Sequence, residues 1–124
     1  ACSMRKSLAA GRLIEVDPVT IADGVALRAP SELTFAHTRR FVHGVVTVSE
    51  EEISRAVLFL LERAKAVVEP SGALPVAALL ARKIAGDGPV VAVLSGGERT
   101  YAGEILAAAT LSSIASLPTS SAAR

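Results

Sequence analysis

Residues 45–65, VVTVSEEEISRAVLFLLERAK, hold the clearest structural pattern in the chain and decide its fold class. The β-branched run at residues 45–48 favours a short strand. Ser49 and Glu52 then have the spacing of a capping box, which marks the start of a helix. Apolar residues recur along one helical face, which predicts a core-facing side: Ile53, Ala56, Val57, Leu60, Leu61 and Ala64. A strand that leads directly into an amphipathic helix is predicted.

The downstream segment extends this alternation of strand and helix. PVAALLARKIAG, residues 75–86, predicts a helix that stops at Gly86, with Pro75 tolerated only in its first turn. PVVAVL, residues 89–94, is apolar on both faces, as in a parallel strand that is covered on both sides. Strand, helix and strand with short joints predict an α/β fold.

The ends of the chain are less regular. Upstream, helices are predicted over residues 3–11 and 31–42, and a strand over residues 12–19, with a turn-rich crossing between them. After Glu98 the composition shifts to alanine, serine and threonine, where a helix over residues 104–117 and a frayed end are predicted.

The composition of the chain argues against several classes of protein. The chain has 124 residues, 51% of them hydrophobic, and a formal net charge of +1, so it can bury a core but has no basic footprint for nucleic acid. It contains no apolar run long enough to cross a membrane and no signal-peptide core. Its one cysteine, Cys2, excludes an internal disulfide framework. A cytoplasmic protein without membrane or nucleic-acid partners is predicted.

The letters LSGG at residues 94–97 leave three interpretations open. They occur in the signature loop of transporter ATPases, at the strand end that holds a pyridoxal phosphate ring, and in simple tight turns. ATPase chemistry needs a glycine-rich phosphate loop followed by Lys and Ser/Thr, and no lysine here follows such a loop. This absence argues against the ATPase interpretation.

Two other sequence patterns are better interpreted as surface residues than as functional sites. Ser3 and Lys6 have the S-x-x-K spacing of penicillin-recognising enzymes, but the companion S-D-N and K-T-G motifs are absent, so an exposed basic helix face is the better interpretation. His37 and His43 lack suitably spaced partner ligands. They are interpreted as surface histidines, and no metal site is predicted.

Glu69 and Ser95 stand where α/β proteins place functional side chains. Glu69 lies at a strand-to-helix joint, where a partly desolvated carboxylate can exchange a proton or hold a ring nitrogen or hydroxyl. A solvated residue that caps the next helix is an equal alternative. Ser95 follows a strand at its carboxyl end, where ligands gather and glycines permit close backbone approach. A plain Ser-Gly-Gly turn is its alternative.

Three separated motifs agree with one family: TIADG (residues 20–24), SEEEISRAVLFLLERAKAVVEPSGA (residues 49–73) and VVAVLSGG (residues 90–97). Their order and spacing resemble the serine/threonine dehydratase family, the type II pyridoxal-phosphate fold that includes threonine deaminase and serine racemase. The resemblance covers residues 1–97. It implies part of the large domain of that fold, a mostly parallel sheet flanked by helices, followed by a divergent Ala/Ser-rich C-terminal tail at residues 98–124.

The resemblance implies a role for four cofactor-binding residues. Ser95 is expected to hydrogen-bond the pyridine nitrogen of pyridoxal phosphate, and Gly24 to lie flat beside the ring. Glu69 is expected near the face of the cofactor, and Gly96, with the next glycine, beneath the ring. A neutral hydroxyl at the ring nitrogen does not enforce its protonation, which suits β-elimination.

The implied activity is the deamination of L-threonine or L-serine to a 2-oxo acid and ammonia. The family's catalytic lysine and its glycine-rich phosphate loop lie upstream of the matched part, so no catalytic residue is expected in this chain. It is interpreted as a C-terminal-region fragment that forms homo-oligomers or associates with the missing part of the fold. A non-catalytic remnant or interaction module of the same fold is the alternative.

The chain departs from the family pattern at several positions. Glu98 replaces the usual Asn, Pro75 interrupts a helix that is normally alanine-rich, and His43 stands where an acidic residue is common. Some members bind a divalent cation near the segment matched by the start of this chain. Ser3 replaces one of the carboxylates there, and no metal is expected.

Overall fold

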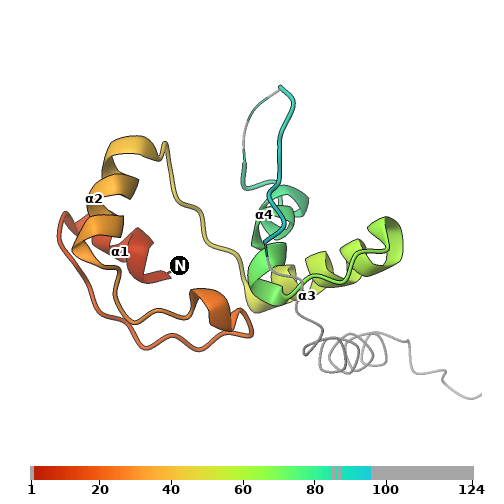
Figure 1. Ribbon diagram of the computed structural model, residues 1–124, viewed down its shortest axis with the longest axis horizontal. Coiled ribbons are helices and arrows are strands. Elements are labelled where there is room, and N and C mark those ends of the chain that lie inside the picture. The colour runs from red at the N-terminus through yellow and green to blue at the C-terminus, as the bar shows by residue number, and fades with distance from the viewer. Residues whose placement is uncertain (1, 85, 87, 96–124) are drawn as a thin grey trace, which may run out of the picture.

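The computed structural model describes residues 2–84, 86 and 88–95. The elements in this part follow in chain order: α1 (Cys2–Ala10), the 3-10 turn η1 (Asp23–Val25), α2 (Glu32–Phe41), α3 (Glu50–Phe59), the π-helical turn η2 (Leu60–Ala64) and α4 (Pro70–Leu80). Figure 1 shows α1 and α2 on one side and the α3–α4 pair on the other, with long extended segments crossing between them. The predictions for Gly96 and for the tail at residues 98–124 lie outside the described residues.

The predicted helix starts are confirmed by their hydrogen bonds. The Ser49 hydroxyl accepts from the Glu52 N–H at 3.3 Å, and the Glu52 carboxylate accepts from the Ser49 N–H at 2.7 Å, which completes the capping box of α3. The Ser31 hydroxyl accepts from the Thr34 N–H at 3.2 Å at the start of α2. Gly11, with φ +68, closes α1 as predicted.

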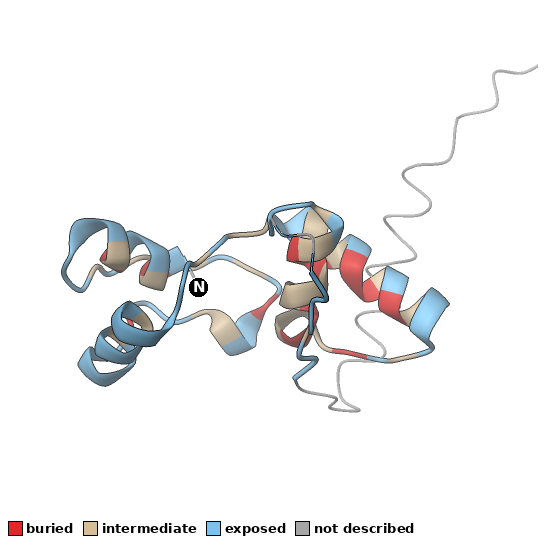
Figure 2. Ribbon diagram, turned by 90° about the horizontal axis from the view of Figure 1, so that it is seen from above, coloured by how far each residue is buried: buried red, intermediate tan, exposed pale blue. Residues whose placement is uncertain are grey.

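The hydrophobic core lies between α3 and α4 (Figure 2). Its buried members share small or branched side chains: Ala56, Val57, Leu60, Val68, Ala73 and Ala77. Alanines on the inner face of α4 let the two helices approach closely. The predicted core face of α3 is confirmed through Leu60, but Ala64 is exposed. The π-helical turn η2 explains this difference, because its wider hydrogen-bonded loop rotates the following residues off the core face.

The limits predicted for the helix at residues 75–86 were wrong. Helix α4 begins at Pro70, five residues earlier than expected, and Pro75 lies in its interior. Proline is well suited to the first helical position, which makes Pro70 the better start, and burial against α3 offsets the hydrogen bond that Pro75 removes. The helix ends at Leu80 because Arg82 adopts a left-handed backbone, φ 53, before Gly86 is reached.

The predicted strands are extended segments without strand pairing in the described part of the chain. Residues 12–19, 45–48 and 89–94 contain no assigned strand. The Val91 side chain is 89% exposed, so the described residues do not supply the cover that is predicted for both faces of this segment. Strand structure requires a hydrogen-bonded neighbour, and no ladder of backbone hydrogen bonds joins these segments in the described part of the chain. The described residues therefore form helices and extended connections rather than the predicted parallel sheet.

The Lys83 side chain links the segment that follows α4 to the start of α3. Its ammonium donates to the Glu52 carboxylate at 2.5 Å and to the Thr47 carbonyl at 2.9 Å. Glu52 therefore completes the capping box and also accepts a charge-assisted hydrogen bond from a residue 31 positions away. This bridge joins the two helices of the core and the extended segment before α3.

The bridge predicts a specific acid sensitivity. The Lys83 ammonium and the Ser49 N–H hold the pKa of Glu52 below its ordinary value of 4.5. A carboxyl with a lowered folded-state pKa stabilises the fold above the unfolded-state pKa, and this contribution is lost as the pH falls through the folded-state value. The melting temperature of the wild type should therefore fall more steeply from about pH 6 to about pH 3 than that of Glu52→Gln.

Lys83→Met is the complementary variant, because it removes the cation and leaves the carboxyl group. Its melting temperature should also depend less steeply on acid pH. Parallel pH profiles for all three proteins would contradict the assignment of this linkage to the Lys83–Glu52 bridge.

Candidate functional site

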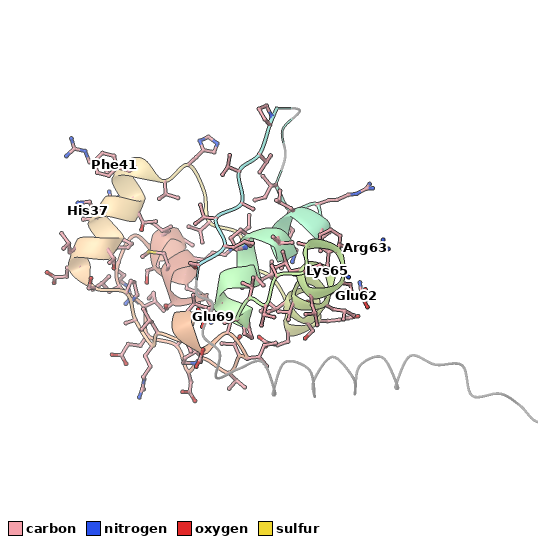
Figure 3. All side chains as sticks on the ribbon, turned by 45° about the vertical axis from the view of Figure 1, so that its right-hand side comes forward. His37, Phe41, Glu62, Arg63, Lys65 and Glu69 are labelled. Carbon is pink, nitrogen blue, oxygen red and sulfur yellow. The ribbon has the colours of Figure 1, made fainter. Side chains whose placement is uncertain are left out.

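The N-terminus of α4 brings together residues from distant parts of the sequence. A Cβ atom added to Gly24 in η1 would lie 2.9 Å from the Ser71 Oγ and 4.0 Å from a Glu69 carboxylate oxygen. Figure 3 shows Glu69 beside η1 at the lower edge of α4. The structure thus places Gly24 and Glu69, both singled out from the sequence, at one place.

Ser95 reaches the same helix end through its backbone. A Cβ atom added to Gly72 would collide with the Ser95 carbonyl oxygen and would lie 2.9 Å from the Ser95 carbonyl carbon. Gly72 is therefore the position that lets the extended segment before Ser95 lie against the first turn of α4. Local sequence carries no clear signal for this contact, because Gly72 lies outside the helix predicted for residues 75–86.

Ser71 is a functional candidate that the sequence analysis did not assign. Its Oγ is buried and has no hydrogen-bond partner, and it is the only side-chain atom in this condition among the described residues. A buried hydroxyl left unpaired costs about 1–3 kcal/mol. The Ser71 hydroxyl is thus a free hydrogen-bonding group between Gly24 and the helix end.

Glu69 occupies the N-cap position of α4, but its side chain makes no capping hydrogen bond. Its backbone has the extended conformation of an N-cap residue, with φ −64 and ψ 157. The interpretation of Glu69 as a helix-capping side chain is therefore wrong. The half-buried carboxylate instead faces the region of Gly24.

Short hydrogen bonds fix the shape of the loop that carries Gly24. The Thr20 hydroxyl accepts from the Ala22 N–H at 3.1 Å, and the Asp23 carboxylate accepts from the Gly24 N–H at 2.7 Å. Ala22 is fully buried. These contacts give residues 20–24 the shape of a defined turn.

The three lysines lie in other surroundings. Lys83 is held by Glu52 and the Thr47 carbonyl, and Lys6 is exposed on α1. Lys65 projects near Glu62, away from Glu69 (Figure 3). In the described part of the chain, no lysine therefore lies beside the residues at the start of α4.

The remaining patterns singled out from the sequence lie apart from this site. His37 and His43 are exposed, as predicted, and the His37 ring hydrogen-bonds the Leu33 carbonyl at 2.9 Å. Lys6 is exposed as predicted, but Ser3 retains only 2% of its accessible surface. The prediction that Ser3 belongs to an exposed helix face was wrong, because its side of α1 is turned inward.

A hollow of about 1110 Å³ lies between two of the extended segments. Residues 46–48 and 90–92 line it together with parts of α1 and α4, and its lining is mostly apolar. None of Gly24, Glu69 or Ser95 borders it. Thr20, Ala22 and Val25 do border it, so the hollow reaches the loop that carries Gly24. No helix in the described part of the chain has the length and hydropathy needed to span a membrane.

Known proteins resemble this chain over most of its length. Residues 1–96 match the family model of the pyridoxal-phosphate dependent enzymes. An L-threonine ammonia-lyase of Geobacter sulfurreducens is 48% identical over 99 residues, which cover 78% of this chain and 25% of that protein. The chain therefore spans about a quarter of the length of the curated relatives it matches.

Solved structures agree with this relationship. A threonine deaminase from T.th. superposes with a TM-score of 0.73 and 42% identity, covering 81% of this chain and 37% of that one. The processed form of threonine deaminase isoform 2 from Solanum lycopersicum gives a TM-score of 0.75 with 31% identity, over 94% and 34% of the two chains. An α/β fold is consistent with these neighbours.

The residues at the start of α4 fit a pyridoxal phosphate group. Gly24 allows its loop to lie directly against Ser71, the buried Ser71 hydroxyl lacks a partner, and the Glu69 carboxylate is not used as a cap. A flat, polar aromatic cofactor needs a few such hydrogen-bonding groups. The family model, the relatives and the solved structures lead to one conclusion: this chain belongs to the pyridoxal-phosphate dependent enzyme family.

Proposed function

We propose that this chain forms the ring-facing part of a pyridoxal phosphate site in an enzyme that deaminates L-threonine or L-serine. The meeting of Gly24, Glu69 and Ser95 at the start of α4 is the observation that carries the proposal. In this proposal residues 1–97 are part of the large domain, and residues 98–124 form a separate tail. The product is a 2-oxo acid, with release of ammonia.

Each site residue has a distinct task in this proposal. Bound pyridoxal phosphate withdraws electrons from the α-carbon of the amino acid and so makes the α-proton acidic. Ser95 hydrogen-bonds the ring nitrogen as a neutral group, Gly24 and Gly96 border the ring, and the Glu69 carboxylate accepts a hydrogen bond near its face. Ser71 supplies a further hydrogen bond from its buried hydroxyl.

The proton-abstracting lysine comes from chain outside these 124 residues. Lys83 is already held by Glu52, and the other two lysines lie away from the site. The extended segments of this chain are proposed to pair with strands from the rest of the protein, which together form a mostly parallel sheet. Side chains from that other part of the protein are proposed to fill the apolar hollow. Homo-oligomer formation and a cytoplasmic location stay predictions.

The expected effect of Ser95→Ala tests the proposal. In the natural full-length protein, loss of the Ser95 hydroxyl should weaken pyridoxal phosphate binding about fivefold, the equivalent of about 1 kcal/mol for one net hydrogen bond. Equilibrium titration followed by cofactor absorbance measures this. Ser54→Ala is the matched control, because the Ser54 hydroxyl bonds the Glu50 carbonyl within α3.

Activity provides the second arm of this test. The natural protein should convert L-threonine to 2-oxobutyrate, and residues 1–124 alone should not. Turnover by residues 1–124 alone would contradict the external lysine. Failure of the natural protein to bind the cofactor would overturn the proposed function and favour the non-catalytic module of the same fold.

A further inference from the structure

The loop that carries Gly24 is tied to α3 by a long-range hydrogen bond. The Ile21 N–H donates to the Glu50 carboxylate at 2.8 Å, across 29 positions of sequence. Glu50 is the first residue of α3, directly after the capping residue Ser49. Its side chain therefore reaches out of the helix start and holds the backbone of a loop that is distant in the sequence.

This hydrogen bond complements the contacts on the opposite side of the loop. Gly24 lies against Ser71 at the start of α4, and Ala22 is fully buried between the two attachments. Helices α3 and α4 pack closely as the core pair. The loop is thus held at Ile21 by one core helix and at Gly24 by the other, which fixes the distance of Gly24 from Glu69.

We propose that Glu50 is a positioning residue for the cofactor site, because its carboxylate holds the 20–24 loop so that Gly24 stays against Ser71 and close to Glu69. The proposal rests on the proposed function and deepens it, since Glu50 acts through the loop and does not itself belong to the residues that touch the cofactor. The negative charge of Glu50 has a second effect, because it stabilises the positive end of α3. A test must separate these two effects.

Glu51 provides the matched control. It carries the same charge in the same first turn of α3, but its carboxylate pairs with Arg55 at 2.5 Å on the exposed helix surface rather than with the loop. Both Glu50→Ala and Glu51→Ala should lower the melting temperature through the start of α3, and Glu50→Ala should lower it further because the hydrogen bond to the loop is also lost. Only Glu50→Ala should release the loop.

The experiment uses the natural full-length protein and two readouts. Amide hydrogen exchange at Ile21, measured without cofactor, should become about tenfold faster in Glu50→Ala than in Glu51→Ala, since a hydrogen bond to a charged group is lost. Pyridoxal phosphate, titrated by absorbance, should bind about fivefold more weakly to Glu50→Ala, while Glu51→Ala should match the wild type. Glu50→Gln retains an acceptor oxygen and should recover most of the affinity.

The outcomes distinguish this proposal from the proposed function. In one outcome the wild type binds the cofactor, and Glu50→Ala and Glu51→Ala bind it with equal affinity. This result would overturn the role of Glu50 and leave the proposed function intact. A wild type that binds no cofactor would overturn both. Unchanged exchange at Ile21 in Glu50→Ala would refute the anchoring of the loop, whatever the cofactor affinities.

Discussion

Gly72→Ala is expected to destabilise the protein by about 2 kcal/mol and to weaken pyridoxal phosphate binding at least about tenfold. The added methyl group would collide with the Ser95 carbonyl oxygen, and it would lie 2.9 Å from the Val68 Cγ1 on its other side. Both neighbours are fixed, because one is backbone and the other belongs to the core. The segment that ends at Ser95 must therefore leave the first turn of α4.

The loss of stability expected for Gly72→Ala is opposite to the usual effect of this substitution in a helix. Gly72 lies inside α4, and replacement of a helical glycine by alanine ordinarily stabilises a protein by about 0.5–1 kcal/mol. Helix propensity and backbone contact therefore predict opposite changes in the free energy of unfolding, and overpacking against backbone is the larger of the two. Urea denaturation of the natural protein measures the net result.

Gly44→Ala is the control for Gly72→Ala. An added Cβ atom at Gly44 would meet nothing within 4 Å, and its backbone is not in the left-handed region. Stability and cofactor affinity should both stay close to the wild type. A Gly72→Ala protein at least as stable as the wild type would show that Ser95 does not rest on α4 in solution.

Gly24→Ala is expected to weaken cofactor binding about tenfold with a smaller loss of stability. Its new methyl group would lie 2.9 Å from the Ser71 Oγ and 3.2 Å from the Ser71 Cβ. The hydroxyl can turn aside by rotation, but the Cβ cannot, so the loop must shift by a few tenths of an ångström. The shift displaces Gly24 from its contact with Ser71 and so disturbs the proposed site.

A second substitution separates displacement of the loop from direct contact with the ring. Ser71→Gly removes the atoms that the new methyl group would meet, so the double variant should recover the position of the loop. If the ring lies against residue 24, cofactor affinity should stay low in the double variant. Full recovery of affinity would mean that Gly24 acts only by avoiding Ser71. Gly88→Ala, where an added Cβ atom meets nothing within 4 Å, controls for the substitution itself.

Local sequence chemistry predicted the helices well and the strands poorly. A capping box such as that of Ser49 and Glu52 is satisfied within one turn, so the sequence alone specifies it. A strand such as residues 89–94 depends on hydrogen-bonded neighbours that the segment itself cannot supply. The early start of α4 is not predicted because two prolines, Pro70 and Pro75, both suit the first turn of a helix, and only packing against the core selects Pro70.

The sequence also predicted only part of the candidate site, because local motifs are visible in the sequence and contacts between distant segments are not. Gly24 and Glu69 were singled out from their motifs, and the structure brings them together. Ser71 and Gly72 were not assigned roles, because an unpaired buried hydroxyl and a close backbone approach are properties of tertiary contact. Their significance follows only from the atoms that surround them.

The pairing of α3 with α4 also has a consequence for the order of folding. These helices are neighbours in the sequence, so their contact closes a short loop and loses little chain entropy, whereas the 20–24 loop and Ser95 must join from farther away. We expect the helix pair to form early and the cofactor site to assemble late, by docking of one segment from each side. Cofactor binding would then report completed folding rather than the presence of the core.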